Sequence, residues 1–101
     1  MIECNSIDEV RNNINNIDEQ IVKLIALRGE FVNQAAKFKK NSHDVKAPIR
    51  VEEVIIKVKN IAQLNGANKE VVENVYRTMI DSFIKAEMKE FEKLKWKLTS
   101  L

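Results

Sequence analysis

Residues 6–40 read SIDEVRNNINNIDEQIVKLIALRGEFVNQAAKFKK, and this stretch decides the fold. Its apolar residues recur at steps of three and four positions, which places them on one face of a helix. They are Ile7, Val10, Ile14, Ile17, Ile21, Leu24, Phe31, Ala35 and Phe38. Ser6 and Glu9 form a capping-box pattern in front of this face. We therefore expect one long helix from about residue 6 to about residue 40.

Arg28 stands on this face where the spacing requires another aliphatic side chain. A charged group at an apolar position is rarely buried without a partner. Two explanations are open from the pattern alone. Arg28 either pairs with an internal carboxylate, such as Glu87 or Asp18, or binds an anionic ligand.

The composition is typical of one all-α domain that covers residues 1–101. Of the 101 residues, 45% are hydrophobic and 32% are charged, and the chain holds two Gly and one Pro. Long segments without a helix breaker predict few, long helices. The 17 basic and 15 acidic residues are interspersed, so we expect no binding to nucleic acid or membrane. A single cysteine, Cys4, and the lack of a signal-peptide pattern predict a reduced, cytoplasmic protein.

Two more helices are expected after a polar connection at residues 41–47. Pro48 suits the first turn of a helix over about residues 48–65, with Gly66 as its stop. Asn68 can cap a third helix over about residues 68–98. Leu94 and Leu98 are expected on the inward face of that helix, and Glu87 interrupts this face. The first and third helices would each be about 45–50 Å long at 1.5 Å per residue. One chain of this size cannot cover them, so we predict an intertwined helical homodimer.

Four cations lie at inward or flanking positions, namely Arg11, Arg28, Lys39 and Arg50. On a continuous helix, Lys39 shares a face with Arg28 about 16 Å away. Arg11 is about 25 Å from Arg28 along the axis and about 100° around it, so the two cannot share a small ligand within one chain. In a dimer with antiparallel first helices, the partner's Arg11 can approach Arg28.

Arginine forks suit carboxylates, so this set of cations predicts a pocket for a small dicarboxylate. A nucleophile beside a base, a phosphate loop and a metal-ligand spacing are all missing from the sequence. His43 stands alone, without a second ligand for a metal. We therefore expect neither a cofactor nor a metal, and chemistry that requires no covalent intermediate.

These residues resemble the all-helical chorismate mutases over essentially the whole chain. The resemblance rests on Ile7 to Arg11, Ile17 to Ile21, Leu27 with Arg28, Lys37 to Lys39, and Arg50. It implies a dimer without cofactor that rearranges chorismate to prephenate in a pericyclic step. It also implies that Arg28 and the partner's Arg11 hold the two carboxylates of the substrate. Lys39 would donate to the ether oxygen of the breaking bond, and Arg50 would add positive charge.

Two positions depart from the mutase pattern. Many mutases carry Glu directly after the second-helix Arg to bind the ring hydroxyl of chorismate, whereas this chain has Val51. The run from Ala47 to Val51 is closer to the isochorismate pyruvate-lyases, which form salicylate and pyruvate on the same fold. At the second position, Glu87 replaces a Gln that donates to the ether oxygen in many members. Glu87 can donate there only when it is protonated, which is our hypothesis for the substrate complex.

Three functions are therefore open, in this order. The first is chorismate mutase, with Lys39, Glu87 and Arg50 as catalytic residues and Arg11, Arg28, Arg50 and Val51 at the substrate. The second is isochorismate pyruvate-lyase, which Val51 and the Ala47-Pro48 run favour. The third is a non-catalytic helical dimer that binds a metabolite or a partner enzyme.

Overall fold

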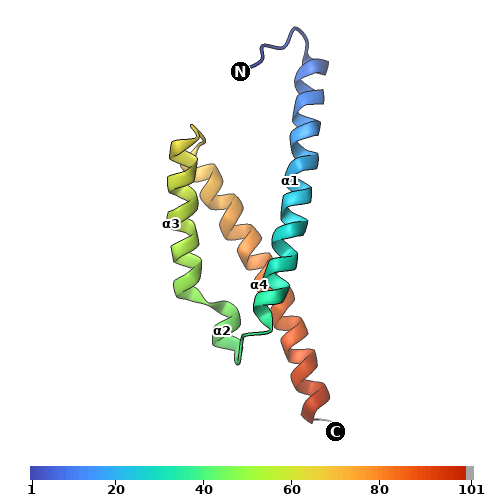
Figure 1. Cartoon of the computed structure of the whole chain (residues 1–101), viewed down its shortest axis with the longest axis vertical. Helices are drawn as coiled ribbons and strands as arrows, with labels where there is room; N and C mark the ends of the chain where they lie inside the picture. The colour runs from blue at the N-terminus through green and yellow to red at the C-terminus, as the bar shows by residue number, and fades with distance from the viewer. Residues whose placement is uncertain (100–101) are drawn as a thin grey trace. The chain divides into compact units, whose positions relative to one another are not determined.

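The computed structural model describes residues 1–99, and the expected all-α class is confirmed over that range. The chain divides into two compact units, residues 1–34 and a second unit that begins at Ala35. The structure has three long helices and one short one (Figure 1), which are α1 (Ile7–Ala36), α2 (Ser42–Lys46), α3 (Pro48–Leu64) and α4 (Lys69–Thr99). None of the described helices is long and apolar enough to cross a membrane.

The first unit consists of the N-terminal segment and most of α1. The Ser6 hydroxyl accepts a hydrogen bond from the backbone N–H of Glu9 at 3.1 Å, as the capping-box pattern predicts. The Glu9 carboxylate reaches one residue further back than expected and accepts from the N–H of Asn5 at 2.8 Å. Both contacts satisfy amide groups that have no partner within the helix, and this fixes the start of α1.

The apolar face of α1 is not buried in the single chain. None of the residues of α1 is buried, and the aliphatic side chains along its face are each about half exposed. The exposed fractions are 49% at Ile14, 53% at Ile17 and 47% at Ile21. A continuous row of exposed aliphatic side chains is unusual for a monomer and typical of an interaction surface.

The end of α1 differs from the expected position at about residue 40. The helix ends at Ala36, and the chain turns through bonds from the N–H of Phe38 to Ala35 O (3.0 Å) and from the N–H of Lys39 to Ala36 O (3.2 Å). These bonds span three residues instead of four and tighten the last turn. The prediction that Lys39 continues the helical face of Arg28 is therefore wrong. Phe38, expected on the apolar face, is 83% exposed.

The connection expected at residues 41–47 contains the short helix α2. The side chain of Asn41 accepts from the backbone N–H of Asp44 at 2.9 Å, which is a standard N-cap contact. Val45 is 3% exposed and anchors α2 in the core. The polar residues of this connection therefore include a local helix signal, which is Asn41 with Asp44 three residues later.

Helices α3 and α4 lie side by side and are joined by a tight turn (Figure 1). Gly66 has a φ of 69°, in the region that favours glycine, and the N–H of Ala67 closes the turn on Ala62 O at 2.8 Å. Asn68 caps α4 as expected, because its side chain accepts from the N–H groups of Glu70 (2.9 Å) and Val71 (3.1 Å). The Gly66 stop and the Asn68 cap are both confirmed.

The core of the second unit lies where α4 packs against α3 and α2. Its buried residues are Val45, Ile55, Val58, Ala62 and Ile80. The end of α4 extends past α2 (Figure 1), so Leu94, expected on the inward face, is 63% exposed. The side chain of Leu98, expected on the same face, lies outside the described residues.

Replacing Val45 by Ala tests whether α2 is part of this core. We expect the free energy of unfolding to fall by about 1–3 kcal/mol, because the substitution removes two buried methyl groups. Urea unfolding followed by circular dichroism measures the change. The matched control is Val71→Ala, at a position that is 57% exposed, which we expect to cost less than about 0.5 kcal/mol. Equal effects of the two substitutions would contradict the placement of α2.

Candidate active site

An ion pair joins the segment after α1 to the middle of α4. The Lys39 ammonium lies 2.9 Å from Oε2 of Glu87, although the two residues are 48 positions apart in the sequence. The side chains are 21% and 9% exposed, so both charges are largely removed from water. A charge in such surroundings requires a partner of opposite sign, and Lys39 and Glu87 are such partners for each other. Glu87 interrupts the inward face of α4 because it holds Lys39.

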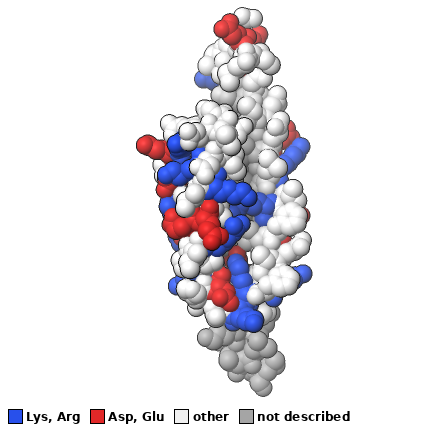
Figure 2. Space-filling model, turned by 60° about the vertical axis from the view of Figure 1, so that its left-hand side comes forward, with Lys and Arg blue, Asp and Glu red and all other residues white. Residues whose placement is uncertain are grey.

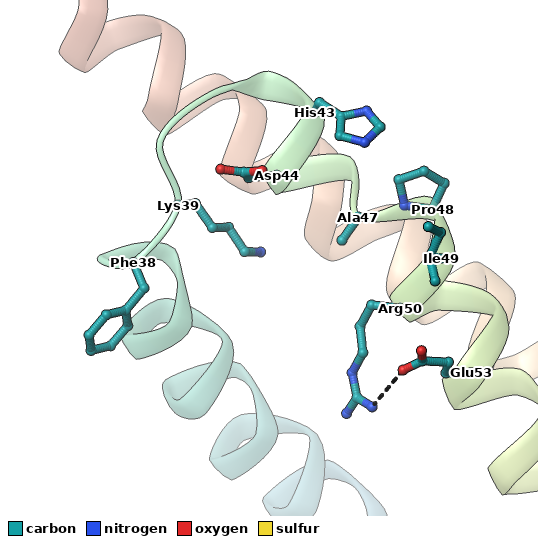
Figure 3. Close-up of a pocket in the computed structure, with 9 residues that line it drawn as sticks. All are labelled: Phe38, Lys39, His43, Asp44, Ala47, Pro48, Ile49, Arg50 and Glu53. Atoms are coloured by element: carbon teal, nitrogen blue, oxygen red, sulfur yellow. Dashed lines mark ion pairs between the residues drawn. The ribbon is translucent and has the colours of Figure 1, made fainter.

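A cleft of about 450 Å³ lies between the end of that segment, α2 and the first turn of α3 (Figure 3). It is lined by Phe38, Lys39, His43, Asp44, Ala47, Pro48, Ile49, Arg50 and Glu53. Figure 3 shows the Lys39 side chain extending from its loop toward α3, whereas the imidazole of His43 points away from the Lys39 side chain. Two cations from different elements, Lys39 and Arg50, therefore line one cleft.

Glu53 is a lining residue that the sequence had not singled out. One of its carboxylate oxygens lies 3.8 Å from Nη1 of Arg50, and the two side chains are 62% and 67% exposed. An ion pair this exposed contributes little energy, so the Arg50 guanidinium can exchange Glu53 for a ligand carboxylate. The three-residue spacing from Arg50 on an expected helix was the signal for this contact.

The candidate residues divide between the two units of the chain. Lys39, Arg50, Val51 and Glu87 belong to the second unit, and their positions follow from its packing. The structure brings Lys39 and Glu87 into contact and places Lys39 and Arg50 at one cleft. Val51 is half-buried and offers no polar atom beyond its backbone.

Arg11 and Arg28 lie on α1 in the first unit. Their roles at the two carboxylates of a substrate stay a prediction. Whether Arg28 pairs with an internal carboxylate or binds an anionic ligand also stays a prediction.

The cleft is lined by charges of both signs. Lys39 and Arg50 supply two positive charges, and Asp44 and Glu53 supply two negative charges. Glu53 is held by its long contact with Arg50, whereas Asp44 accepts from the backbone N–H of Lys40 at 3.0 Å. Within residues 1–99, no group of three or more His, Cys, Asp or Glu side chains could hold a metal ion. On the face shown in Figure 2, basic and acidic side chains lie next to each other instead of forming a field of one sign.

Comparison with known proteins identifies the family of the chain. The family model for chorismate mutase type II matches residues 10–88, a span that contains Arg11, Arg28, Lys39, Arg50 and Glu87. The chain therefore belongs to the chorismate mutase type II family. A curated relative, the isochorismate pyruvate lyase of Pseudomonas aeruginosa, is 28% identical over 87 residues, which is 86% of each chain. The resemblance found in the sequence is confirmed, including its lyase branch.

Replacing Lys39 by Met tests whether the ion pair is as buried as its geometry indicates. The variant leaves the Glu87 carboxylate without its partner at 9% exposure, and we expect the free energy of unfolding to fall by about 1–3 kcal/mol. Urea unfolding at one fixed protein concentration measures the change, since any dimerisation contributes to stability.

The control for this experiment is Lys85→Met. Lys85 pairs with Asp81 at 3.0 Å, but the two side chains are 74% and 63% exposed, so the expected loss is below about 0.5 kcal/mol. The Glu87→Gln variant should lose less stability than Lys39→Met, because the amide oxygen still accepts from Lys39 and the ammonium is 21% exposed. A Lys39→Met variant as stable as Lys85→Met would show that the pair is solvated.

Proposed function

We propose that the protein is an isochorismate pyruvate-lyase, which eliminates pyruvate from isochorismate and leaves salicylate. The observation that carries the proposal is Val51, directly after Arg50 in the first turn of α3. An aliphatic side chain cannot accept a hydrogen bond, so a ring hydroxyl facing Val51 would be buried without a partner. In isochorismate the hydroxyl sits elsewhere on the ring. The lyase relative also supports placing the lyase first. This reverses the ranking made from the sequence alone, in which chorismate mutase came first.

The residues of the cleft suit this reaction because a pericyclic elimination requires positioning and charge stabilisation, with no nucleophile. As the carbon–oxygen bond breaks, a ring hydrogen moves to the methylene carbon of the enolpyruvyl group, which leaves as pyruvate. Lys39 donates from Nζ to the ether oxygen, where negative charge grows. Glu87 holds the ammonium in place from 2.9 Å, or donates to the same oxygen once it is protonated. Arg50 binds a carboxylate in exchange for its weak contact with Glu53.

A homodimer completes the site in this proposal. Arg28 and the partner's Arg11 hold the two substrate carboxylates, and the first helices of two copies pack antiparallel along their apolar faces. The exposed aliphatic side chains of α1 support this arrangement. A 30-residue helix is about 45 Å long and offers a surface that a second copy can cover. We place the enzyme in the cytoplasm, where its one cysteine remains reduced.

Chorismate mutase is the second candidate, in which the same site rearranges chorismate to prephenate. The full set of cations favours it, because Arg11, Arg28, Lys39 and Arg50 all fall within the residues that the family model matches. The two reactions share a dicarboxylate substrate and an ether oxygen, so few contacts separate them. An enzyme with both activities would follow from the same residues.

Assays with both substrates decide between the candidates. The purified protein is mixed with isochorismate in one cuvette, where salicylate fluorescence is followed, and with chorismate in another, where absorbance reports its loss. We expect salicylate formation with kcat/KM at least about tenfold above that for chorismate, because a missing hydroxyl partner costs about 1–3 kcal/mol. Faster turnover of chorismate would make the protein a mutase. Turnover of neither would leave a non-catalytic helical dimer.

Mixing two inactive variants tests the contribution of the partner subunit. Arg11→Ala and Arg28→Ala are each expected to lose turnover while remaining folded dimers. In a mixed dimer, one site has its own Arg28 and the partner's Arg11 intact, and the other site lacks both. Co-expression should then restore about a quarter of wild-type activity, from half of the sites in the half of the dimers that are mixed.

No restored activity, with mixed dimers verified by mass spectrometry, would show that Arg11 does not act across the interface. Co-expression of Arg28→Ala with Lys39→Ala is the control. Both side chains belong to the same site of one chain in this proposal, so no mixed dimer contains an intact site.

A further inference from the structure

A cluster of four charged side chains joins α3 to α4 outside the cleft; we call it the Arg77 cluster, and it consists of Glu52, Lys59, Glu73 and Arg77. Nη1 and Nη2 of Arg77 donate to the two carboxylate oxygens of Glu52, at 2.9 and 3.0 Å. Nε of Arg77 donates to Glu73 on its own helix at 2.8 Å. Lys59 lies 3.1 Å from the other oxygen of Glu73. The Arg77 guanidinium therefore joins α3 to α4 through its two Nη atoms and makes a contact within α4 through Nε.

Glu52, which accepts from the two Nη atoms of Arg77, lies in the part of α3 that carries the cleft residues. Glu52 is the second residue after Arg50 and directly precedes Glu53, and both of those line the cleft. Residues two positions apart on a helix point about 200° apart, which places Arg50 and Glu52 on opposite sides of the turn. Arg50 faces the cleft, and Glu52 faces Arg77 on α4.

The first turn of α3 has no buried side chain of its own. Its N-cap residue, Ala47, makes no side-chain capping hydrogen bond and has a φ of 38°, which is unfavourable for a residue with a Cβ. Pro48, Ile49 and Arg50 are exposed, and the buried residues of α3 begin at Ile55. A helix end without a cap frays unless side chains hold it, and the bidentate contact to Arg77 holds this one.

We propose that Arg77 is a positioning residue of the active site, which fixes the first turn of α3 through Glu52 and so keeps Arg50 at the cleft. The inference rests on the proposed function, because it takes Arg50 as a residue that binds substrate. Arg77 itself does not line the cleft and acts only through Glu52.

The charges of the Arg77 cluster persist at the pH of the cytoplasm. Arg77 keeps the pKa of Glu52 below its ordinary value of 4.5, and Arg77 and Lys59 do the same for the pKa of Glu73. Both carboxylates therefore stay ionised above pH 4.5 and lose their contacts as the pH falls through the lowered values. All four side chains are partly exposed, so the cluster contributes modestly to global stability. We expect the Arg77 cluster to act mainly on the position of the first turn of α3.

A double-mutant cycle with Arg50 tests the inference on the substrate that the wild type converts. Arg77→Gln should lower kcat/KM about tenfold, because small misplacements of a binding group reduce rate strongly. In an Arg50→Ala background the same substitution should change kcat/KM by about twofold or less, since the group that Arg77 positions is already gone. Asp81→Asn is the matched control: it breaks an exposed ion pair within α4, with Lys85, and has no link to α3.

Two further measurements separate positioning from loss of fold. Arg77→Lys keeps the charge but loses the fork, so it should be impaired almost as much as Arg77→Gln while its thermal unfolding stays close to the wild type. Amide hydrogen exchange at residues 50–54 should accelerate in Arg77→Gln and not in Asp81→Asn.

Equal losses of kcat/KM in the wild-type and the Arg50-substituted backgrounds would overturn this inference and leave the proposed function intact. An Arg77→Gln variant as active as Asp81→Asn would do the same. A wild-type protein that converts neither isochorismate nor chorismate would instead show that the proposed function is wrong, and the inference would fall with it.

Discussion

The ion pair between Lys39 and Glu87 is the contact on which the site depends. It fixes the side chain of Lys39, which lies outside any helix because α1 has already ended at Ala36. Without Glu87 to hold it, the ammonium would follow the turn at residues 37–40 and have no defined position. With Glu87, a side chain from the irregular segment stands at a constant place relative to α4. Helix packing supplies the scaffold, and one partly buried charge pair supplies the alignment.

Local signals in the sequence were sufficient to locate the ends of most helices. Ser6, Gly66 and Asn68 act through hydrogen bonds or a φ value that only their immediate neighbours determine, so the pattern carried the information. The early end of α1 had no such signal, because it comes from a tight turn that the apolar spacing does not mark. Helix α2 had a signal in the Asn41 cap, but a helix of five residues also depends on Val45 in the core of the second unit, which is a tertiary constraint. The geometric relation assumed for Arg28 and Lys39 failed because α1 ends before Lys39.

The candidate site was predictable where a residue broke a pattern. Glu87 on the inward face of α4, and Lys39 and Arg50 as cations beside apolar residues, were all identified before the structure showed their contacts. Glu53 and Arg77 were missed because a charged residue on an exposed helix face interrupts nothing. Their significance comes from what lies opposite them, and the contact from α4 to the first turn of α3 joins residues 25 positions apart. Choosing between the two reactions rests on Val51, where an aliphatic side chain stands in place of an acceptor.

Ala47 is at once the C-cap residue of α2 and the N-cap residue of α3, so the two helices share a joint with no spare length. A linker of several residues absorbs an insertion by bulging, but a joint of one residue transmits it. One added residue would turn the start of α3 by about 100° relative to α2 and carry Arg50 away from the cleft. Variation in chain length is therefore expected to concentrate at residues 37–41, ahead of α2, and to avoid the junction at Ala47 and Pro48. The spacing between α2 and Arg50 is in this sense as much a part of the site as the side chains themselves.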